Sequence, residues 1–229
     1  REPENTRDGD RAIGDARVQN RDIFIQWFDH WLRGSDNGVG QWPRAQVYLP
    51  GKNSWKSFGT WPAARSQGTF HLHSKSGAAS RFGDGALLDA APTEPASDTF
   101  SYDPRYPVPT IGGDACCLAD VNGSKVQPGS FDQGPIELRE DVLVYSSAEL
   151  DTPLDVVGFA EVELYVSSDA PDTDFTANLV DVAPDGTAFI LAGSIQRARW
   201  RDGYEEPRFM KPNQVYKLKI GPFFVSYRF

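Results

Sequence analysis

The chain has 229 residues, a formal net charge of −9 and 39% hydrophobic residues. This is the composition of a globular protein that can bury a core of its own, and it excludes disordered and fibrous chains. No apolar run approaches the roughly 18 residues of a membrane helix. Lysines and arginines are scattered singly among acids, whereas phosphate binding needs them clustered. We therefore expect neither a membrane nor a nucleic acid as a partner.

Near the N-terminus, residues 15–33 have the periodicity of an amphipathic helix. Large apolar residues recur there at spacings of three and four, which aligns them on one side of an α-helix. They are Ile23, Phe24, Trp27, Phe28, Trp31 and Leu32. Gly34 follows as a C-cap, and the loop Ser35–Gln41 is rich in Gly, Asp and Asn. The clearest boundary in the chain therefore lies just after this helix.

From Pro43 onward the patterning is that of short strands bounded by turn residues. Between two of them, Pro184-Asp185-Gly186 predicts a hairpin turn, because Pro presets the turn and Gly accepts a positive φ. Alternating, half-buried strands joined in this way predict an antiparallel β-sandwich over residues 43–220. The predicted strands are Ala45–Leu49, Thr69–His73, Asp141–Ser146, Leu154–Val166, Phe175–Ala183, Ala188–Arg201 and Gln214–Ile220.

The stretch from Ser74 to Gln133 is far longer than an ordinary connection and is dense in Gly, Pro, Ser and Asp. Two interpretations stay open: a functional excursion, or a segment with short strands that the pattern does not reveal. We expect it to be ordered, because it contains residues that pack well, namely Phe100, Tyr102, Tyr106, Pro107 and Pro109.

Motifs for serine catalysis are missing from the sequence. Neither a Gly-x-Ser-x-Gly elbow nor a Ser-x-x-Lys pattern occurs. We therefore assign no catalytic residue and predict that the chain alone is inactive as a hydrolase.

The histidines and cysteines give no metal-binding pattern either. His71 and His73 share one face of a strand and could hold a metal in principle, but a third ligand at suitable spacing is missing. We interpret them as a polar strand edge, and His30 as an edge residue of the helix. Cys116 and Cys117 are adjacent, so we interpret them as reduced thiols packed in a loop. No metal and no cofactor is expected.

Acidic and basic side chains cluster in the last third of the chain. The acids Asp169, Asp172, Asp174, Asp181 and Asp185 could form a calcium loop, but they lack the spacing of an EF-hand. We favour the interpretation that they cap turns. The alternating arginines of a predicted strand are expected to face carboxylates across the sheet. They are Arg197, Arg199 and Arg201.

Nearly the whole chain from the helix to about Ile220 resembles the cocaine-esterase-like (CocE/NonD) hydrolase family, including the β-sandwich domain of X-prolyl dipeptidyl peptidases. The order and spacing of the matching stretches carry this resemblance. They are Trp27–Gly34, Val47–Gly51 with Trp55, Trp61-Pro62, Tyr102-Asp103-Pro104, Pro107–Gly113, Asp132-Gln133, Arg139–Tyr145, Ser167–Phe175 and Asp181–Gly186.

The resemblance implies a jelly-roll, galactose-binding-like antiparallel β-sandwich with one N-terminal amphipathic helix. Residues 1–34 would hold the final helix of an α/β-hydrolase domain that is otherwise absent, and residues 35–229 would form the sandwich. In this family the Ser, Asp and His of the triad precede the helix. Family members continue beyond the residues that match Ile220 through further strands, so we expect a sandwich that is truncated at its C-terminus.

Two functions from different classes follow. The first is the C-terminal accessory part of a serine hydrolase of esters or Xaa-Pro peptides, which shapes and covers the substrate cleft. The loop Ile111–Leu118 would reach the cleft, with Cys116, Cys117 and Leu118 as candidate cleft residues. The partner of the helix at residues 15–33 would then be the hydrolase domain or another copy of this chain.

The alternative is a stand-alone carbohydrate-binding module. Jelly-roll sandwiches also stack sugars on exposed aromatic rings, and such a module would use the tryptophans for this purpose. The candidates are Trp42, Trp55, Trp61 and Trp200.

Overall fold

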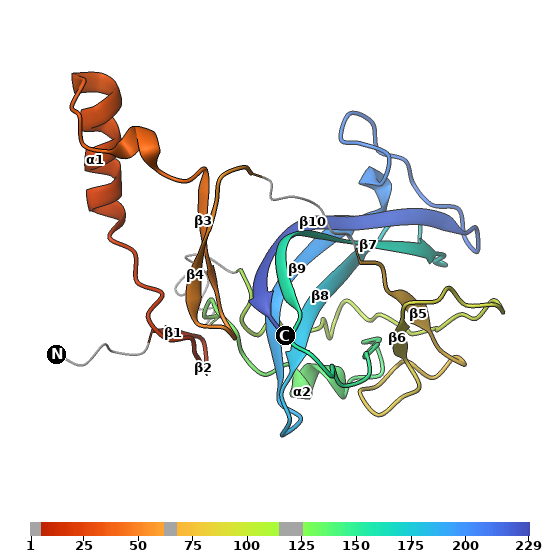
Figure 1. Ribbon diagram of the computed structural model, residues 1–229. Helices are drawn as coiled ribbons and strands as arrows, with labels where there is room; N and C mark the ends of the chain where they lie inside the picture. The colour runs from red at the N-terminus through yellow and green to blue at the C-terminus, as the bar shows by residue number, and fades with distance from the viewer. Residues whose placement is uncertain (1–5, 62–67, 115–125) are drawn as a thin grey trace.

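The computed structural model describes residues 6–61, 68–114 and 126–229 and shows a mainly β protein with few helices (Figure 1). Its strands form two-stranded antiparallel sheets. The two largest sheets pair β7 (Asp155–Val166) with β10 (Tyr216–Arg228), and β8 (Asp174–Val182) with β9 (Ala188–Arg197). The smaller sheets pair β1 (Arg7–Asp8) with β2 (Arg11–Ala12), β3 (Ala45–Leu49) with β4 (Ser54–Phe58), and β5 (His71–His73) with β6 (Ala86–Leu88).

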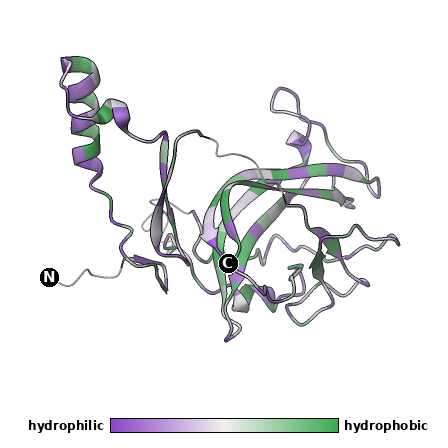
Figure 2. Ribbon diagram, viewed as in Figure 1, coloured by the Kyte–Doolittle hydropathy of each residue, from purple (hydrophilic) through white to green (hydrophobic). Residues whose placement is uncertain are grey.

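The core lies where β10 packs against β9. Ala192 of β9 forms one buried cluster with Phe223, Val225 and Tyr227 of β10, and residues of β7 and β8 pack around it. Along β10 the buried residues alternate with exposed lysines, as a strand with one face on a core requires. The two large sheets therefore bury their apolar faces against each other. Figure 2 shows hydrophobic stretches, in green, along these strands.

A bulge in β10 keeps its apolar face aligned with the core. Ile220 pairs with Val162 and Phe223 with Ala160, so two residues of β10, Gly221 and Pro222, stand opposite the single residue Glu161 of β7. Ile220 and Phe223 are both buried even though they are an odd number of residues apart. An extra residue inserted in one strand restores the alternation in this way. The predicted strand ended at Ile220, whereas β10 runs on to Arg228, so the prediction was too short by eight residues at this end.

The predicted turn between β8 and β9 is confirmed. Gly186 adopts φ +84° and donates its N–H to the carbonyl of Ala183 at 2.8 Å. The Asp185 carboxylate accepts the N–H of Thr187 at 2.9 Å. The strand prediction for β3 is also confirmed to the residue, and those for β7 and β8 agree within one residue at each end.

Other strand predictions were wrong in part. Residues 141–146 do not form the predicted strand, because their backbone bonds go to scattered positions and not along one partner strand. The N–H of Val144 donates to the Ala78 carbonyl, and Ser146 exchanges backbone hydrogen bonds with Gly85 and Leu87. The long stretch after Ser74 does contain a short strand, β6, which its pattern did not reveal. Strand β9 ends at Arg197, where the 3-10 helix η3 (Ala198–Trp200) begins. Strand β4 and the short helix α2 (Gly134–Glu137) were not predicted.

Helix α1 (Asn20–Arg33) begins five residues after the predicted start at Asp15. The residues before it make other contacts: the N–H of Ala16 donates to the Thr6 hydroxyl at 3.3 Å, and Arg17 pairs with Asp15. The end is as predicted: Gly34 takes φ +70° and its N–H donates to the carbonyls of the last turn. After a 3-10 turn, η1 (Val39–Gln41), the chain enters β3.

Candidate docking site

Helix α1 extends away from the strands (Figure 1), and its aromatic face lies in solvent. We define this aromatic face as Phe24, Trp27, Phe28 and Trp31. Phe24, Phe28 and Trp31 are 62%, 54% and 60% exposed, and α1 has no buried residue. The rings of Trp27 and Trp31 lie 5.8 Å apart between centroids. Soluble monomers rarely expose a contiguous apolar patch of this kind unless it serves an interaction.

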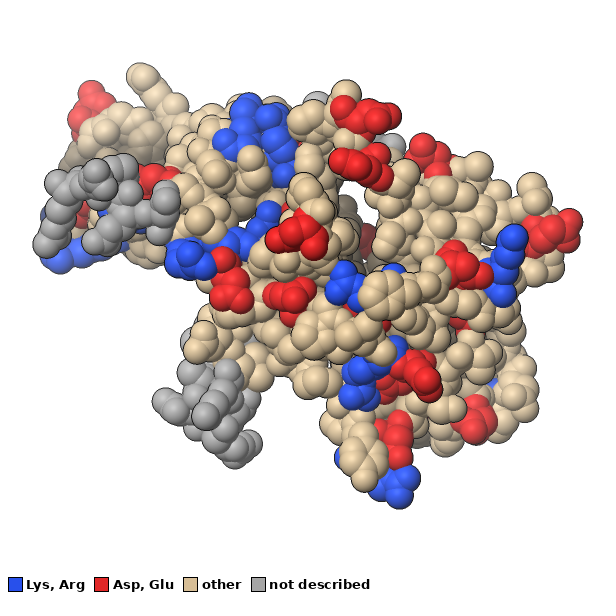
Figure 3. Space-filling model, turned by 90° about the horizontal axis from the view of Figure 1, so that it is seen from below, with Lys and Arg blue, Asp and Glu red and all other residues tan. Residues whose placement is uncertain are grey.

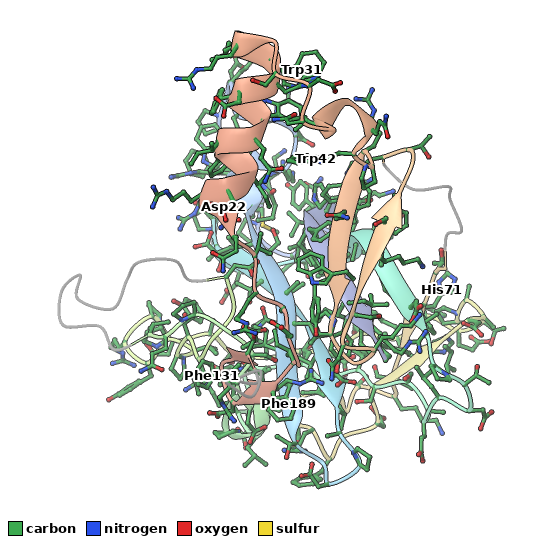
Figure 4. The ribbon with its side chains drawn as sticks, turned by 60° about the vertical axis from the view of Figure 1, so that its left-hand side comes forward. Asp22, Trp31, Trp42, His71, Phe131 and Phe189 are labelled. Carbon is green, nitrogen blue, oxygen red and sulfur yellow. The ribbon has the colours of Figure 1, made fainter. Side chains whose placement is uncertain are left out.

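The end of α1 is rigidly built. The ring of His30 donates from Nδ1 to the carbonyl of Ser35 at 2.9 Å and lies edge-on to Trp31, with centroids 4.8 Å apart. The side-chain amide of Asn37 reaches back to the carbonyl of Gln26 at 2.8 Å. His30 therefore closes the C-terminal turn of the helix, in agreement with its interpretation as an edge residue. Figure 4 shows Trp31 on the helix and Trp42, which follows η1.

The start of the predicted cleft loop is fixed to the body of the protein. Gln133 donates from Nε2 to the carbonyl of Ile111 at 2.8 Å, and Gly113 pairs with Gly129 through two backbone bonds. Gly112 has φ +70°, and a Cβ there would lie 2.4 Å from the carbonyl oxygen of Gly129. The candidate cleft residues Cys116, Cys117 and Leu118 lie outside the described residues.

A cavity of about 520 Å³ lies beside this loop. Burial raises the pKa of the Asp8 carboxyl, and the charge of Asp114 raises it further, while the Ser130 N–H and Arg11 lower it. The hydroxyl of Ser130 donates to the carbonyl of Ile190 at 2.7 Å, so this serine is not paired with a base. Among the described lining residues, Ser130 is thus not an activated nucleophile. The described lining consists of Asp8, Gly113, Asp114, Pro128, Gly129, Ser130, Ile190 and Leu191.

The acidic residues after β7 are mostly engaged by arginines. Arg197 pairs with Asp174 at 2.5 Å, directly across the β8–β9 sheet, and with Asp172 at 3.4 Å. The Asp172 carboxylate also accepts the N–H of Arg199 at 3.0 Å. The cross-strand prediction is thus confirmed for Arg197, whereas Arg199 belongs to η3 and Arg201 follows it. Across the three described ranges, no group of three or more His, Cys, Asp and Glu side chains could hold a metal ion.

The two strand histidines lie on β5, as predicted, and both are half-buried. His73 donates from Nε2 to the carbonyl of Ala90 at 2.7 Å, which ties β5 to the segment that follows β6. Its partner is a backbone carbonyl, which fits the interpretation of a polar strand edge.

The tryptophans of the carbohydrate hypothesis lie on separate elements. Trp55 of β4 packs edge-on against Tyr48 and is 45% exposed. Trp61 packs between Phe58 and Phe224, and Trp200 packs beside Tyr204. Trp42 lies at the end of η1. Sugar binding stays a prediction.

Two clusters that the sequence reasoning missed join distant segments. Asp98 accepts hydrogen bonds from the Ser74 hydroxyl at 2.5 Å, the Ala78 N–H at 2.9 Å and the Tyr145 hydroxyl at 2.7 Å. Arg11 of β2 reaches Asp181 of β8 at 3.0 Å. Neither cluster has a local sequence signal, because its members are far apart in the chain.

On the face of the molecule drawn in Figure 3, acidic and basic side chains are interspersed. In the part of the chain that the structure describes, no helix has the length and hydrophobicity needed to cross a bilayer.

The fold and the exposed helix define the class of protein. A family model for the X-Pro dipeptidyl-peptidase C-terminal non-catalytic domain matches residues 37–229, so the chain belongs to this family. The resemblance to cocaine-esterase-like hydrolases is also confirmed. Over 219 residues the chain is 35% identical to the cocaine esterase of Rhodococcus sp. (strain MB1 Bresler), covering 93% of this chain and 37% of that protein.

Solved structures share the fold. An α-amino acid ester hydrolase superposes with a TM-score of 0.72 at 23% identity, over 94% of this chain and 36% of that chain. An aminopeptidase from a marine sediment Thaumarchaeota archaeon gives a TM-score of 0.70 at 23% identity, over 91% and 34%. The chain thus spans little more than a third of the length of each of these relatives.

Proposed function

We propose that this chain is the C-terminal accessory part of a serine hydrolase that cleaves esters or Xaa-Pro peptides. The catalytic triad would lie in an α/β-hydrolase unit outside these residues. Residues 1–34 would belong with that unit, and residues 35–229 would form the sandwich, with the β7–β10 and β8–β9 sheets as parts of a jelly roll. The family match, which starts at residue 37, supports this division.

The observation that carries the proposal is the exposed aromatic face of α1. Burying one large apolar side chain contributes about 1.5–3 kcal/mol, so four aromatic residues left in solvent favour association strongly. The base of the helix is held by the body of the protein, yet α1 has no buried residue and packs mainly against the short turn η1. We infer that a hydrolase unit covers this face, with self-association as the substitute when that unit is missing.

The second part of the proposal concerns the substrate cleft. The loop Ile111–Leu118 would reach from the rigid pair Gly113–Gly129 toward the catalytic unit. Cys116, Cys117 and Leu118 would then line the cleft and limit which acyl or peptide groups enter it. The sandwich would shape and cover the site, while the nucleophile, base and oxyanion donors come from the hydrolase unit.

To test this proposal, the source genome is sequenced on the 5′ side of the codon for Arg1, and the reading frame is followed upstream. A frame that encodes a Gly-x-Ser-x-Gly elbow, and whose product co-purifies with this chain and hydrolyses p-nitrophenyl esters, supports the proposal. This chain alone should show no burst and no turnover above buffer. The proposal fails if this chain turns over the ester by itself and a serine-directed phosphonate labels it.

Matched variants test whether the hydrolase unit binds this chain through α1. Phe28→Ser together with Trp31→Ser should weaken co-purification at least about tenfold, because two buried aromatic side chains are lost. Phe82→Ser, which removes an exposed phenylalanine far from α1 in sequence, is the control and should leave co-purification unchanged. Equal binding by the two would contradict docking through α1.

A further inference from the structure

The N-terminal hairpin β1–β2 lies on the body of the protein and makes close backbone contacts there. Gly9, at its turn, has φ +59°, and a Cβ added there would lie 2.4 Å from the Ser130 carbonyl oxygen. A Cβ on Gly129 would in turn lie 2.5 Å from the Gly9 nitrogen. The N–H of Asp10 donates to the Ser130 carbonyl at 3.0 Å. The backbones at Gly9 and at Gly129 thus approach each other so closely that only glycine fits at either position.

Next to this contact, Arg11 enters a site built from three residues of β8, β9 and β10. Its guanidinium lies 4.8 Å from the ring centroid of Phe189 and 4.7 Å from that of Tyr227. It pairs with Asp181 at 3.0 Å and also donates to the Tyr227 hydroxyl, which itself donates to Asp181 at 2.8 Å. We call Asp181, Phe189 and Tyr227 the Arg11 site. Figure 4 shows Phe189 beside the hairpin.

The charges in the Arg11 site are shielded from solvent. The side chains of Arg11 and Asp181 are only 17% and 19% exposed. Burial raises the pKa of Asp181 and lowers that of Arg11, against the attraction between them. Desolvation therefore offsets much of the gain from pairing, as is common for buried ion pairs. Such a pair adds little net stability and acts mainly by favouring one arrangement of the hairpin and the β-sheets over others.

A further contact of the segment lies between the hairpin and α1. The Tyr48 hydroxyl of β3 donates to the Ile13 carbonyl, and a Cβ on Gly14 would lie 2.9 Å from the same hydroxyl. Because β3 follows α1 in the chain, this contact joins the two ends of the segment that carries the helix. The base of α1 is thus closed between the hairpin and β3.

From these contacts we propose that the hairpin β1–β2 is a docking element, and that its receptor site, formed by Gly129, Ser130 and the Arg11 site, sets the direction in which α1 projects. The hairpin lies outside the residues 37–229 that match the family model, while its receptor lies inside them. The contact is therefore an interface between two parts of the polypeptide, and it can open locally while the sandwich stays folded.

The experiment is hydrogen–deuterium exchange on the full chain with Arg11→Met. Amides of residues 6–16 should exchange about tenfold faster or more, because the variant removes the ion pair to Asp181 and the stacking of the guanidinium on Phe189 and Tyr227, which hold the hairpin. Amides of β7 and β10 should keep their wild-type rates. The matched control is Arg17→Met, because Arg17 makes its ion pair within its own segment, with Asp15. It should change residues 6–16 less than about twofold.

Two results would overturn the proposal. One is equal exchange of residues 6–16 in Arg11→Met and Arg17→Met. The other is an equal acceleration of β10 amides in Arg11→Met, since Arg11 would then serve general stability. If Arg11→Met does not fold, Arg11→Lys replaces it: the lysine keeps the charge but loses the flat stacking between the two rings, so residues 6–16 should still exchange faster while β10 does not.

Discussion

Helix α1 and strand β10 both carry a dense series of large apolar side chains, yet only β10 buries them. Leu218 of β10 is 1% exposed, whereas Leu32 of α1 is 76% exposed. Strand β10 finds its partners within the chain, in β7 and β9. Helix α1 contacts mainly the short turn η1. The difference teaches that β10 contributes to the core of this chain, while α1 leaves its aromatic face exposed; under the proposed function, a hydrolase unit covers that face.

The difference between the two regions is tested most strongly by making the same substitution, leucine to alanine, in each of them. Leu218→Ala should lower the free energy of unfolding by about 2–5 kcal/mol, because it removes buried surface and leaves a cavity. Leu32→Ala should change it by about 0.5 kcal/mol or less, because alanine suits an exposed helix position. Urea titration measures both. Equal losses would mean that α1 is part of the folded core.

A second prediction concerns the polar cluster around Asp98, which connects the long stretch after β5. Burial raises the pKa of this carboxyl, but hydrogen bonds from Ser74, Ala78 and Tyr145 outweigh burial, and the net pKa is lowered. The stabilisation is therefore present above the unfolded-state pKa and is lost as the pH falls through the lower folded-state pKa.

Asp98→Asn should accordingly cost about 1–2 kcal/mol at pH 7, since hydrogen bonds to a carboxylate are lost. It should cost less near pH 3, where the wild-type carboxyl takes up protons. Urea midpoints at both values measure this, with Glu94→Gln as a control on the same segment. A cost that stays constant from pH 7 to pH 3 would contradict this assignment.

A smaller effect is expected for the surface ion pairs between Arg197 and the acids Asp172 and Asp174. Arg197→Gln should cost no more than about 1 kcal/mol, because the Arg197 side chain is 43% exposed and solvent screens its pairs. The cost should shrink further in 1 M salt, where the Debye length is about 3 Å. A larger, salt-independent cost would assign these residues to the core rather than to the surface.

The smallest expected effect is that of chelation. EDTA should leave the melting temperature unchanged, because arginines already engage Asp172 and Asp174. A drop of about 2–4 °C, the shift for roughly 1 kcal/mol in a domain of this size, would restore the acidic segment Asp169–Asp185 as a calcium site.

The sequence predicted those parts of the fold that local chemistry decides. The turn at Gly186, the C-cap at Gly34 and the strand Ala45–Leu49 each depend on a few neighbouring residues, and each is confirmed. Residues 141–146 read as a strand but lack a partner long enough to make one. Strand β10 passes Gly221-Pro222 because a bulge there restores its alternation.

The candidate site also has one part that the sequence predicts and another that only the folded structure reveals. The aromatic stripe of α1 could be found from its spacing, because helical periodicity is a local property. The contacts of Arg11 with Asp181, Phe189 and Tyr227 could not be found, because only the folded chain brings these residues together. The assignment of Cys116, Cys117 and Leu118 to a cleft came from family resemblance alone and stays a prediction.

The central claim is that a hydrolase unit covers the aromatic face of α1, and oxidative footprinting tests it most directly. Hydroxyl radicals are applied to this chain with and without the α/β-hydrolase product of the extended coding sequence, and Trp31 is compared with Trp55 of β4 as the internal reference. We predict that oxidation of Trp31 falls at least about fivefold in the complex while that of Trp55 is unchanged, because burial removes a side chain from solvent. Equal oxidation of Trp31 in both samples, with the two proteins bound to each other, would contradict the claim.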